Sequence, residues 1–466
     1  MREPDQAQIL HFNLLDMASP SHNNYGLWRL PENQKRRFRE VAFWQETARA
    51  CEDALFDSLF IADVLGISAA HAGSQDLALR EGIHVPELDP AVVAAAVIPA
   101  TTHLGIAVTQ SCTYEHPFAL ARRMASLDQL SGGRVGWNIV MSYHPNANEN
   151  FGFDPAHLTS EERYDRAEDF MDVAYKLFEQ SWEDDAVVAD TERGIYADPA
   201  KVHRIDHAGP YYRCSGPSLV DPGPQRTPLL FQAGMSDRGR KFAARHAEVV
   251  FVLNRNDESM HAVIRDLREQ AAAFGRGPSE LKIVPQVNII VGETTAEARA
   301  KLDRYQSFTR AEGYLAHEFG RGFDPFAFPR SMRVTDALEA AGQTRADSGA
   351  YGRQPDLTIG ELIDAAADLA NERFFVCGDA AAVADAVEEW ADTFGLDGFN
   401  LRNYSHPHTV RDFGDHVVPE LQRRGRYRLA YEGHTLREHV FGAGHSRIAP
   451  THPAAAYRLP GTRTGI

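Results

Sequence analysis

The residues best suited to bind a phosphate group lie in the segment 231–239, which reads FQAGMSDRG. A predicted strand ends there at Gly234, and a predicted helix begins just after Ser236. The first turn of a helix presents free N–H groups and a partial positive charge, and both favour a phosphate. Ser236 can also serve only as the N-cap of its own helix. The local pattern leaves both roles open.

Two further hydroxyl groups could reach the same phosphate. Ser142 follows the predicted strand Arg134–Val140, and Tyr164 stands at the beginning of the next long helix. Parallel barrels hold their active sites at the end where the strands finish, so both hydroxyls would lie at that rim. Tyr164 can equally be an ordinary half-buried helix residue. Asp63 ends another predicted strand at the same rim, and its alternative role is a helix or turn cap.

The sequence predicts no metal site and no nucleotide-binding domain. His203 and His207 have the i, i+4 spacing of metal ligands, but their segment resembles a turn and no carboxylate completes a known motif. The four cysteines are far apart, which supports neither zinc nor disulfides. No complete G-x-G-x-x-G or Walker A motif is present. A redox cofactor would therefore be held by the barrel itself, and a flavin would have to be reduced elsewhere.

Charge and hydropathy indicate a soluble enzyme. The 466 residues carry a formal net charge of -17, which argues against binding to nucleic acid or to an anionic membrane surface. The N-terminus lacks the apolar core of a signal peptide, and the longest apolar run, 91–100, is too short to cross a bilayer. We therefore expect a cytoplasmic location.

Short β-branched runs alternate with longer segments of helical period, which is typical of βα units around a parallel sheet. Eight predicted strands indicate an α/β protein with a closed (β/α)₈ TIM barrel, formed by one domain over residues 1–440. The predicted strands are 9–15, 58–62, 104–109, 134–140, 228–233, 249–253, 283–291 and 398–404. The predicted helices are 36–54, 91–101, 118–130, 160–179, 238–246, 259–274, 295–313 and a closing helix at 413–425.

Three segments exceed a minimal barrel. Residues 184–225 are rich in Pro, Gly and His and are expected to form a long excursion before the fifth strand. Residues 314–373 include GQTRADSGAYGRQPD and are expected to form a helical lid or a mobile loop. Residues 441–466 are expected to form a C-terminal arm that lies on a partner subunit.

Several longer motifs occur together in one order: GLWRLPENQ at 26–34, FDSLFIADVLG at 56–66, TYEHPFALARRMASLDQLSGGRVGWNIVMS at 113–142 and PQRTPLLFQAGMSDRGRKFAARHAEVVF at 224–251. They resemble the FMN-dependent two-component monooxygenases of the bacterial-luciferase-like superfamily, which include nitrilotriacetate and dibenzothiophene-sulfone monooxygenases. The resemblance covers nearly the whole chain. It is fullest with the long-chain alkane monooxygenases of that group.

The resemblance implies a luciferase-like barrel that receives FMNH₂ from a separate NAD(P)H-dependent flavin reductase. Reaction with O₂ would give a flavin peroxide, and a dry cavity would protect it until the substrate arrives. The family further implies a homodimer or homotetramer. Position by position, the resemblance implies that Asp63 contacts the isoalloxazine edge of FMN. Ser142, Tyr164 and Ser236 would contact its phosphate. Ala233, Gly234 and Met235 would supply backbone around the phosphate.

The substrate side differs from the alkane enzymes, where Cys, Tyr, Gln and His stand at the positions aligned with Ser19, Ser68, His84 and Tyr143. These changes predict a bulkier and more polar substrate, a heteroaromatic or flavin-like ring compound of the kind that riboflavin lyase cleaves. Candidate catalytic residues are His22, His84, His317 and Tyr143, the histidines as proton donors. The alternatives are a long-chain alkane substrate, a deazaflavin-dependent dehydrogenase and a metal-dependent barrel hydrolase.

Overall fold

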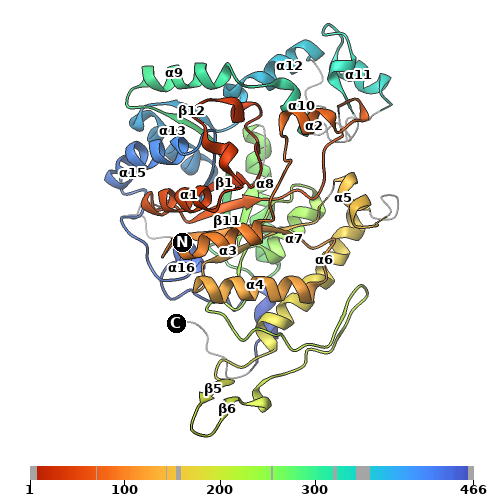
Figure 1. The fold of residues 1–466 in the computed structure, drawn as a ribbon, viewed down its shortest axis with the longest axis vertical. Coiled ribbons are helices and arrows are strands. Elements are labelled where there is room, and N and C mark those ends of the chain that lie inside the picture. The colour runs from red at the N-terminus through yellow and green to blue at the C-terminus, as the bar shows by residue number, and fades with distance from the viewer. Residues whose placement is uncertain are drawn as a thin grey trace.

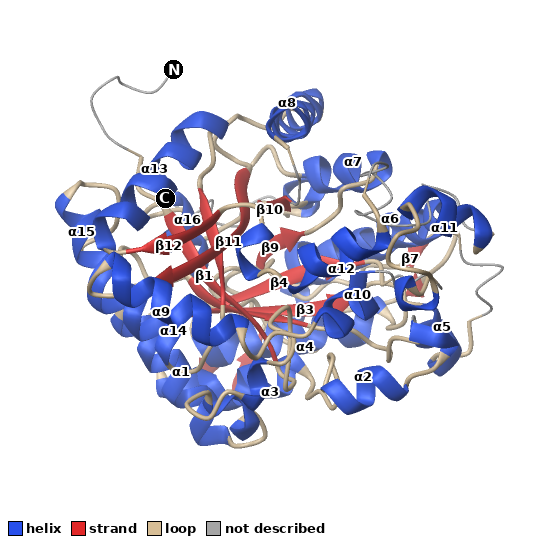
Figure 2. Ribbon diagram, turned by 90° about the horizontal axis from the view of Figure 1, so that it is seen from above, coloured by secondary structure: helices blue, strands red, loops and turns tan. Residues whose placement is uncertain are grey.

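A computed structural model describes residues 8–69, 71–142, 144–153, 159–252, 256–318, 323–342 and 357–459. Eight parallel strands close into a barrel at the centre of this part, and helices surround it (Figure 2). The predicted α/β barrel is confirmed, and each predicted strand corresponds to a barrel strand. These are β1 (His11–Met17), β2 (Ser58–Ala62), β3 (Gly105–Ser111), β4 (Val135–Val140), β9 (Leu229–Gln232), β10 (Val249–Val252), β11 (Lys282–Val291) and β13 (Gly398–Arg402). A further short strand, β12 (Phe375–Gly378), pairs with the end of β11.

Most of the predicted helices are present, with two differences. The main outer helices are α1 (Val41–Asp53), α3 (Pro90–Val97), α4 (Pro117–Ser131), α6 (Ser160–Tyr175), α7 (Asp237–His246), α8 (Asp257–Ala273), α9 (Thr295–Gln306), α13 (Ala380–Phe394) and α15 (Val418–Arg423). Helix α13 is missing from the predicted set. The single helix predicted over 295–313 is wrong, because α9 ends at Gln306 and α10 (Ala311–Glu318) begins separately.

The interruption between α9 and α10 has a tertiary cause. The N-H of Arg310 donates to the carbonyl of Tyr25 at 3.3 Å, and the carbonyl of Phe308 accepts a hydrogen bond from the Arg29 guanidinium. Gly26 lies so close that a β-carbon there would stand 2.2 Å from the Phe308 oxygen. The segment after β1 therefore uses backbone groups that a continuous helix would have needed for itself.

The lower half of the barrel is filled by apolar side chains and closed by the C-terminal part of the chain. Helix α16 (Leu436–Phe441) inserts Leu436 and Val440 among inward-facing residues of the strands. Leu436 is fully buried, and its side chain lies where β-carbons on Gly105 and Gly136 would stand. Among the described residues, the start of the barrel is thus plugged, and the opposite end is the candidate place for a ligand.

The predicted C-terminal arm lies on its own chain as far as residue 459. Arg458 forms an ion pair with Glu179 at 2.9 Å, and the His452 ring contacts the carbonyl of His246 at 2.9 Å. The segment 184–225 contains two short hairpins, β5–β6 and β7–β8, and the first of them projects at the lower end of Figure 1. These hairpins are β5 (Val187–Asp190) with β6 (Ile195–Ala197), and β7 (His207–Ala208) with β8 (Arg213–Cys214).

Helices from the segment 314–373 gather at the other end of the molecule. Helices α10, α11 (Val334–Ala340) and α12 (Ile359–Ala367) share a small apolar core of their own. Helix α10 also packs on α2 (Asp76–Glu81), which follows β2 (Figure 1). Residues 319–322 and 343–356 lie outside the described residues. Along the described stretches, no helix is both long and apolar enough to cross a membrane.

Candidate functional site

The predicted phosphate ligands follow neighbouring strands at the open rim of the barrel. Strands β4 and β9 pair in parallel with Ile139 opposite Gln232, so the residues just after each strand lie side by side. Ser142 is one such residue, and its hydroxyl donates to the hydroxyl of Ser111 at 2.9 Å, at the end of β3. The three strands β3, β4 and β9, which are neighbours in the sheet, thus end in or just before a serine or a glycine: Ser111, Ser142 and Gly234.

Ser236 and Tyr164 meet at the beginning of α7. Ser236 caps the helix, because its oxygen accepts from the N–H of Gly239 at 3.0 Å. The hydroxyl of Tyr164, a buried residue of α6, shares a hydrogen bond with Ser236, and burial raises the pKa of that phenol. A β-carbon at Gly239 would stand 2.6 Å from the Tyr164 oxygen, so glycine is required for this approach.

The chain between β9 and α7 runs beside these hydroxyls. Ala233 is exposed, and Met235 is partly buried with its carbonyl accepting from Arg240 at 2.7 Å. A β-carbon at Gly234 would lie 2.3 Å from the amide nitrogen of Gln232. Arg238 places its guanidinium 5.6 Å from the Tyr164 ring and is paired with Asp165 at 3.1 Å and Glu168 at 3.2 Å. The hydroxyls and the helix start fit a phosphate-sized anion.

Asp63 stands at the end of β2 and contacts a carboxyl group that the sequence analysis did not single out, Glu87. The two side chains share a hydrogen bond. Burial and the negative charge of Asp89 raise the pKa of Asp63 to about 7. Burial and the charge of Asp63 raise the pKa of Glu87 to about 10. At neutral pH, this pair therefore holds at least one proton.

His22 and His84 lie together in an aromatic cluster near α2 and α10. The Nε2 atom of His84 is 3.1 Å from the carbonyl oxygen of His22, and the two rings are 5.9 Å apart. Tyr25 is 6.3 Å from the His84 ring and 6.0 Å from the ring of Tyr314. His84 has a φ of 55°, an uncommon value for a residue other than glycine, and such strain concentrates at functional sites.

For the other predicted substrate and catalytic residues, the described part of the structure gives no contact that supports the predicted role. Ser19 is fully buried, and its hydroxyl donates to the carbonyl of Ser21 at 2.9 Å, so it presents no surface to a ligand in this conformation. Ser68 is partly buried in the loop between β2 and α2. His317 belongs to α10. Tyr143 lies outside the described residues. The roles assigned to these four residues stay predictions.

His203 and His207 do not converge as a pair. His203 contacts Glu183 at 2.9 Å, whereas His207 contacts Asp169 at 2.9 Å and Lys176 at 3.0 Å. In the described ranges, no group of three His, Cys, Asp or Glu side chains could hold a metal ion.

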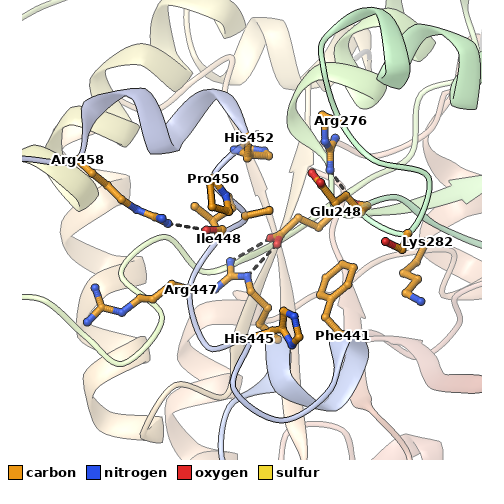
Figure 3. Close-up of a pocket in the computed structure, with 14 residues that line it drawn as sticks. Glu248, Arg276, Lys282, Phe441, His445, Arg447, Ile448, Pro450, His452 and Arg458 are labelled. Carbon is orange, nitrogen blue, oxygen red and sulfur yellow. Dashed lines mark hydrogen bonds and ion pairs between the residues drawn. The ribbon is translucent and has the colours of Figure 1, made fainter. Parts of the chain in front are cut away.

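A cavity of about 350 Å³ lies at the plugged end of the barrel, between the C-terminal segment and the starts of β10 and β11 (Figure 3). Two of its arginines are paired within the chain, Arg437 with Glu248 at 2.8 Å and Arg447 with Asp184 at 3.2 Å, and Arg276 donates to backbone carbonyls. Ser142, Ser236 and Asp63 follow the other ends of their strands. This cavity therefore belongs to the C-terminal packing and is separate from the candidate site.

Sequence reasoning missed Glu87, Tyr25, Tyr314 and Gly239. Glu87 occurs in the loop sequence HVPELDP, which has no motif that would mark a functional carboxyl group. Gly239 had a usable signal, since a glycine in the first turn of a helix costs stability and calls for a steric reason.

The family model described as luciferase-like monooxygenase matches residues 25–397. The long-chain alkane monooxygenase of Geobacillus thermodenitrificans (strain NG80-2) is 42% identical over 451 residues, covering 96% of this chain and 98% of that protein. The dimethyl-sulfide monooxygenase of Hyphomicrobium sulfonivorans is 40% identical over 454 residues, covering 96% and 93%. A riboflavin lyase solved with modified FMN and riboflavin has a TM-score of 0.88 at 37% identity, covering 97% of this chain and all (100%) of that one.

Proposed function

The chain belongs to the luciferase-like monooxygenase family, and on that premise we propose that it is a two-component monooxygenase that uses reduced FMN and O₂. The observation that carries the proposal is the meeting of Tyr164 and Ser236 at the start of α7, beside Ser142 at the same rim. Ser142, Tyr164 and Ser236 would hold the phosphate of FMN. The backbone of 233–235 would line the cofactor, and Asp63 would contact its ring.

Reduced FMN, when bound, supplies the electrons that activate O₂ for insertion into the substrate. The protein has to position the substrate, hold the protons and exclude water. His22 and His84 are the described histidines placed to hold a proton near the substrate, and His317 of α10 is a third candidate. Helices α10 and α2 pack on each other beside this aromatic cluster, which favours a role in keeping water out.

A separate NAD(P)H-dependent flavin reductase is the proposed partner. The sequence contains no complete dinucleotide fingerprint. A relative named nitrilotriacetate monooxygenase component A, from Aminobacter aminovorans, is 34% identical over 426 residues. A cofactor that is exchanged with a reductase must bind reversibly, so oxidised FMN should bind more weakly than reduced FMN.

Anaerobic titration of the purified protein tests this function. We expect saturable binding of reduced FMN, weaker binding of oxidised FMN, and no oxidation of NAD(P)H by this chain alone. Reduced deazaflavin serves as the comparison ligand, because a deazaflavin-dependent dehydrogenase would prefer it. Tight retention of FMN through dialysis together with NAD(P)H oxidation would contradict the two-component proposal.

For the substrate, we propose a heteroaromatic or flavin-like ring compound. The cluster of His22, Tyr25, His84 and Tyr314 supports it, since aromatic side chains pack favourably against a planar ring. The test compares oxygen consumption and product yield for riboflavin-like and sulfur-containing ring compounds with those for a long n-alkane. Efficient coupled hydroxylation of the alkane would contradict this proposal and favour the alternative substrate, a long-chain alkane.

A further inference from the structure

Asp63 and Glu87 make an unusual contact at the rim of the barrel. Both side chains accept a hydrogen bond from the backbone N–H of Val64, and they also share one with each other. The Oε1 atom of Glu87 is buried and receives no hydrogen bond from a donor group of the described chain. A carboxyl oxygen that no N–H group reaches, placed beside another carboxyl, is satisfied when a proton lies between the two.

The surrounding charges favour the same arrangement. Asp89 and Glu115 face Asp63, and both act against a second negative charge on the pair. Lys35 is the cation that faces Glu87, but its ammonium group is bound to Asp16 at 2.5 Å. Glu115 in turn is paired with Arg123 at 2.7 Å. Two ionised carboxylates in contact would have no free countercharge among the described residues, so the pair retains a proton.

The buried oxygen of Glu87 sets the direction of the hydrogen bond. An ionised Glu87 would hold its charge next to a buried Oε1 atom that no donor of the described residues reaches. Glu87 is accordingly the neutral donor, and Asp63 is the acceptor that ionises first. The raised pKa of Glu87 agrees with this order.

We propose that Asp63 and Glu87 form a proton-sharing pair beside the bound flavin, in which neutral Glu87 donates to Asp63 and Asp63 exchanges a second proton with the ligand. This inference rests on the proposed binding of FMN. In the step, the O–H bond of Asp63 breaks, the proton passes to a basic atom of the ligand, and the carboxylate left behind is held by Glu87 and Val64. Solvent then returns the proton, and no electrons move. Glu87 is a positioning residue, because it acts through Asp63.

Infrared spectroscopy of the flavin-free protein tests the pair itself. At about pH 8.5, between the two pKa values, we expect an acid C=O band that Glu87→Gln removes. As the pH falls through about 7, a second band should grow, and Asp63→Asn should remove that growth. Asp128, whose pKa burial raises to about 6, adds an increase that every variant keeps. An acid band at pH 8.5 that persists in Glu87→Gln, or one that is absent from the unmodified protein, overturns the pair.

Two further variants separate positioning from folding. Glu87→Gln keeps a donor and should leave the Asp63 midpoint near 7, whereas Glu87→Ala removes the donor and should raise the midpoint by about one pH unit. Glu115→Gln is the matched control, because it removes a facing charge without removing either member of the pair. It should keep both bands and lower the midpoint slightly. Equal midpoints in the Gln and Ala variants, with both proteins folded by circular dichroism, would contradict the positioning role.

The link to the flavin needs a separate measurement, the affinity for reduced FMN as a function of pH. The phosphate of FMN titrates at about pH 6, and this contribution is common to all variants. We expect the unmodified protein to show an additional change in affinity at about pH 7 that Asp63→Asn lacks. If infrared spectroscopy shows the pair but Asp63→Asn binds FMN with an unchanged pH dependence, proton exchange with the flavin is wrong and the proposed function stands. If the unmodified protein binds no reduced FMN, both the proposed function and the role beside the flavin fail.

Discussion

Ser236 carries two interactions on one oxygen, and this makes it the most informative single residue of the candidate site. It caps α7 through Gly239 and shares a hydrogen bond with Tyr164. Replacing Ser236 with Ala should weaken FMN binding by about 1–2 kcal/mol through the loss of a hydrogen bond to a charged group. The loss of the cap should also cost about 1 kcal/mol of stability. Calorimetric titration and thermal unfolding measure the two effects.

The matched control is Asn256→Ala. Asn256 caps the neighbouring helix α8 by accepting from the N–H of Ser259 at 2.9 Å. Its replacement should cost similar stability and leave FMN affinity unchanged. If Ser236→Ala and Asn256→Ala behave alike in both measurements, Ser236 is only a helix cap.

His84 should affect how the oxidation is coupled to the substrate and not how FMN binds. Its ring lies beside those of His22 and Tyr25, whereas Ser236 and Tyr164 meet at the start of α7. His84→Ala should therefore lower product yield and raise the release of H₂O₂, with flavin affinity nearly intact. Product and peroxide assays under the same flux measure this, and His445→Ala, an exposed histidine at the plugged end, serves as the control. A loss of FMN affinity as large as that of Ser236→Ala would place His84 in the flavin site.

At the scale of elements, α16 determines which end of the barrel is filled and which end is left for a ligand. Leu436 is fully buried against Gly105 and Gly136, so Leu436→Ala would leave a cavity at the bottom of the barrel. We expect a loss of about 2–5 kcal/mol in the free energy of unfolding. FMN affinity should not change, because the proposed flavin contacts lie at the opposite strand ends. Denaturant unfolding and flavin titration test both statements.

Leu429→Ala is the control for that variant, since Leu429 is 80% exposed and lies shortly before α16. Its replacement should change stability by less than about 0.5 kcal/mol. If Leu436→Ala is as harmless as Leu429→Ala, the C-terminal segment does not plug the barrel in solution. If it abolishes flavin binding while the protein stays folded, the two ends are coupled.

At the scale of the whole molecule, buried ion pairs should make stability depend on acid pH. Glu168 joins α6 to α7 through His246 at 2.9 Å, Arg245 at 2.9 Å and Arg238 at 3.2 Å. Burial would raise its pKa, but these partners lower it to about 2. Because the folded-state pKa lies below the ordinary value, the stabilisation is complete above about pH 4.5 and is lost as the pH falls toward 2.

Glu168→Gln should remove roughly 2 kcal/mol at neutral pH and flatten the decline in stability between about pH 4.5 and 2. Urea unfolding across that range measures it. The exposed Glu269→Gln should follow the unmodified protein throughout. Parallel curves for Glu168→Gln and the unmodified protein would show that this cluster does not contribute to acid sensitivity.

The sequence by itself determined the barrel and the family, and it supplied the residues of the proposed site. Short β-branched runs separated by helical periods define the eight strands, because local hydrophobic periodicity depends on near neighbours in the chain. The predicted strand 134–140 differs from β4 by one residue at its start. The motifs around Ser142 and Ser236 indicated the family, and the match to the family model confirms that the chain belongs to it.

Only the tertiary structure decided which side chains meet. The path of the connection between β2 and α3 brings Asp63 to Glu87, and the packing of α6 on α7 brings Tyr164 to Ser236 over Gly239. Docking of the chain after β1 ends α9 early, and α16 returns to fill the barrel from below. None of these contacts has a local periodicity or a fixed spacing in the sequence. They follow from the closed sheet and its packed helices, whose three-dimensional arrangement lies beyond what neighbouring residues encode.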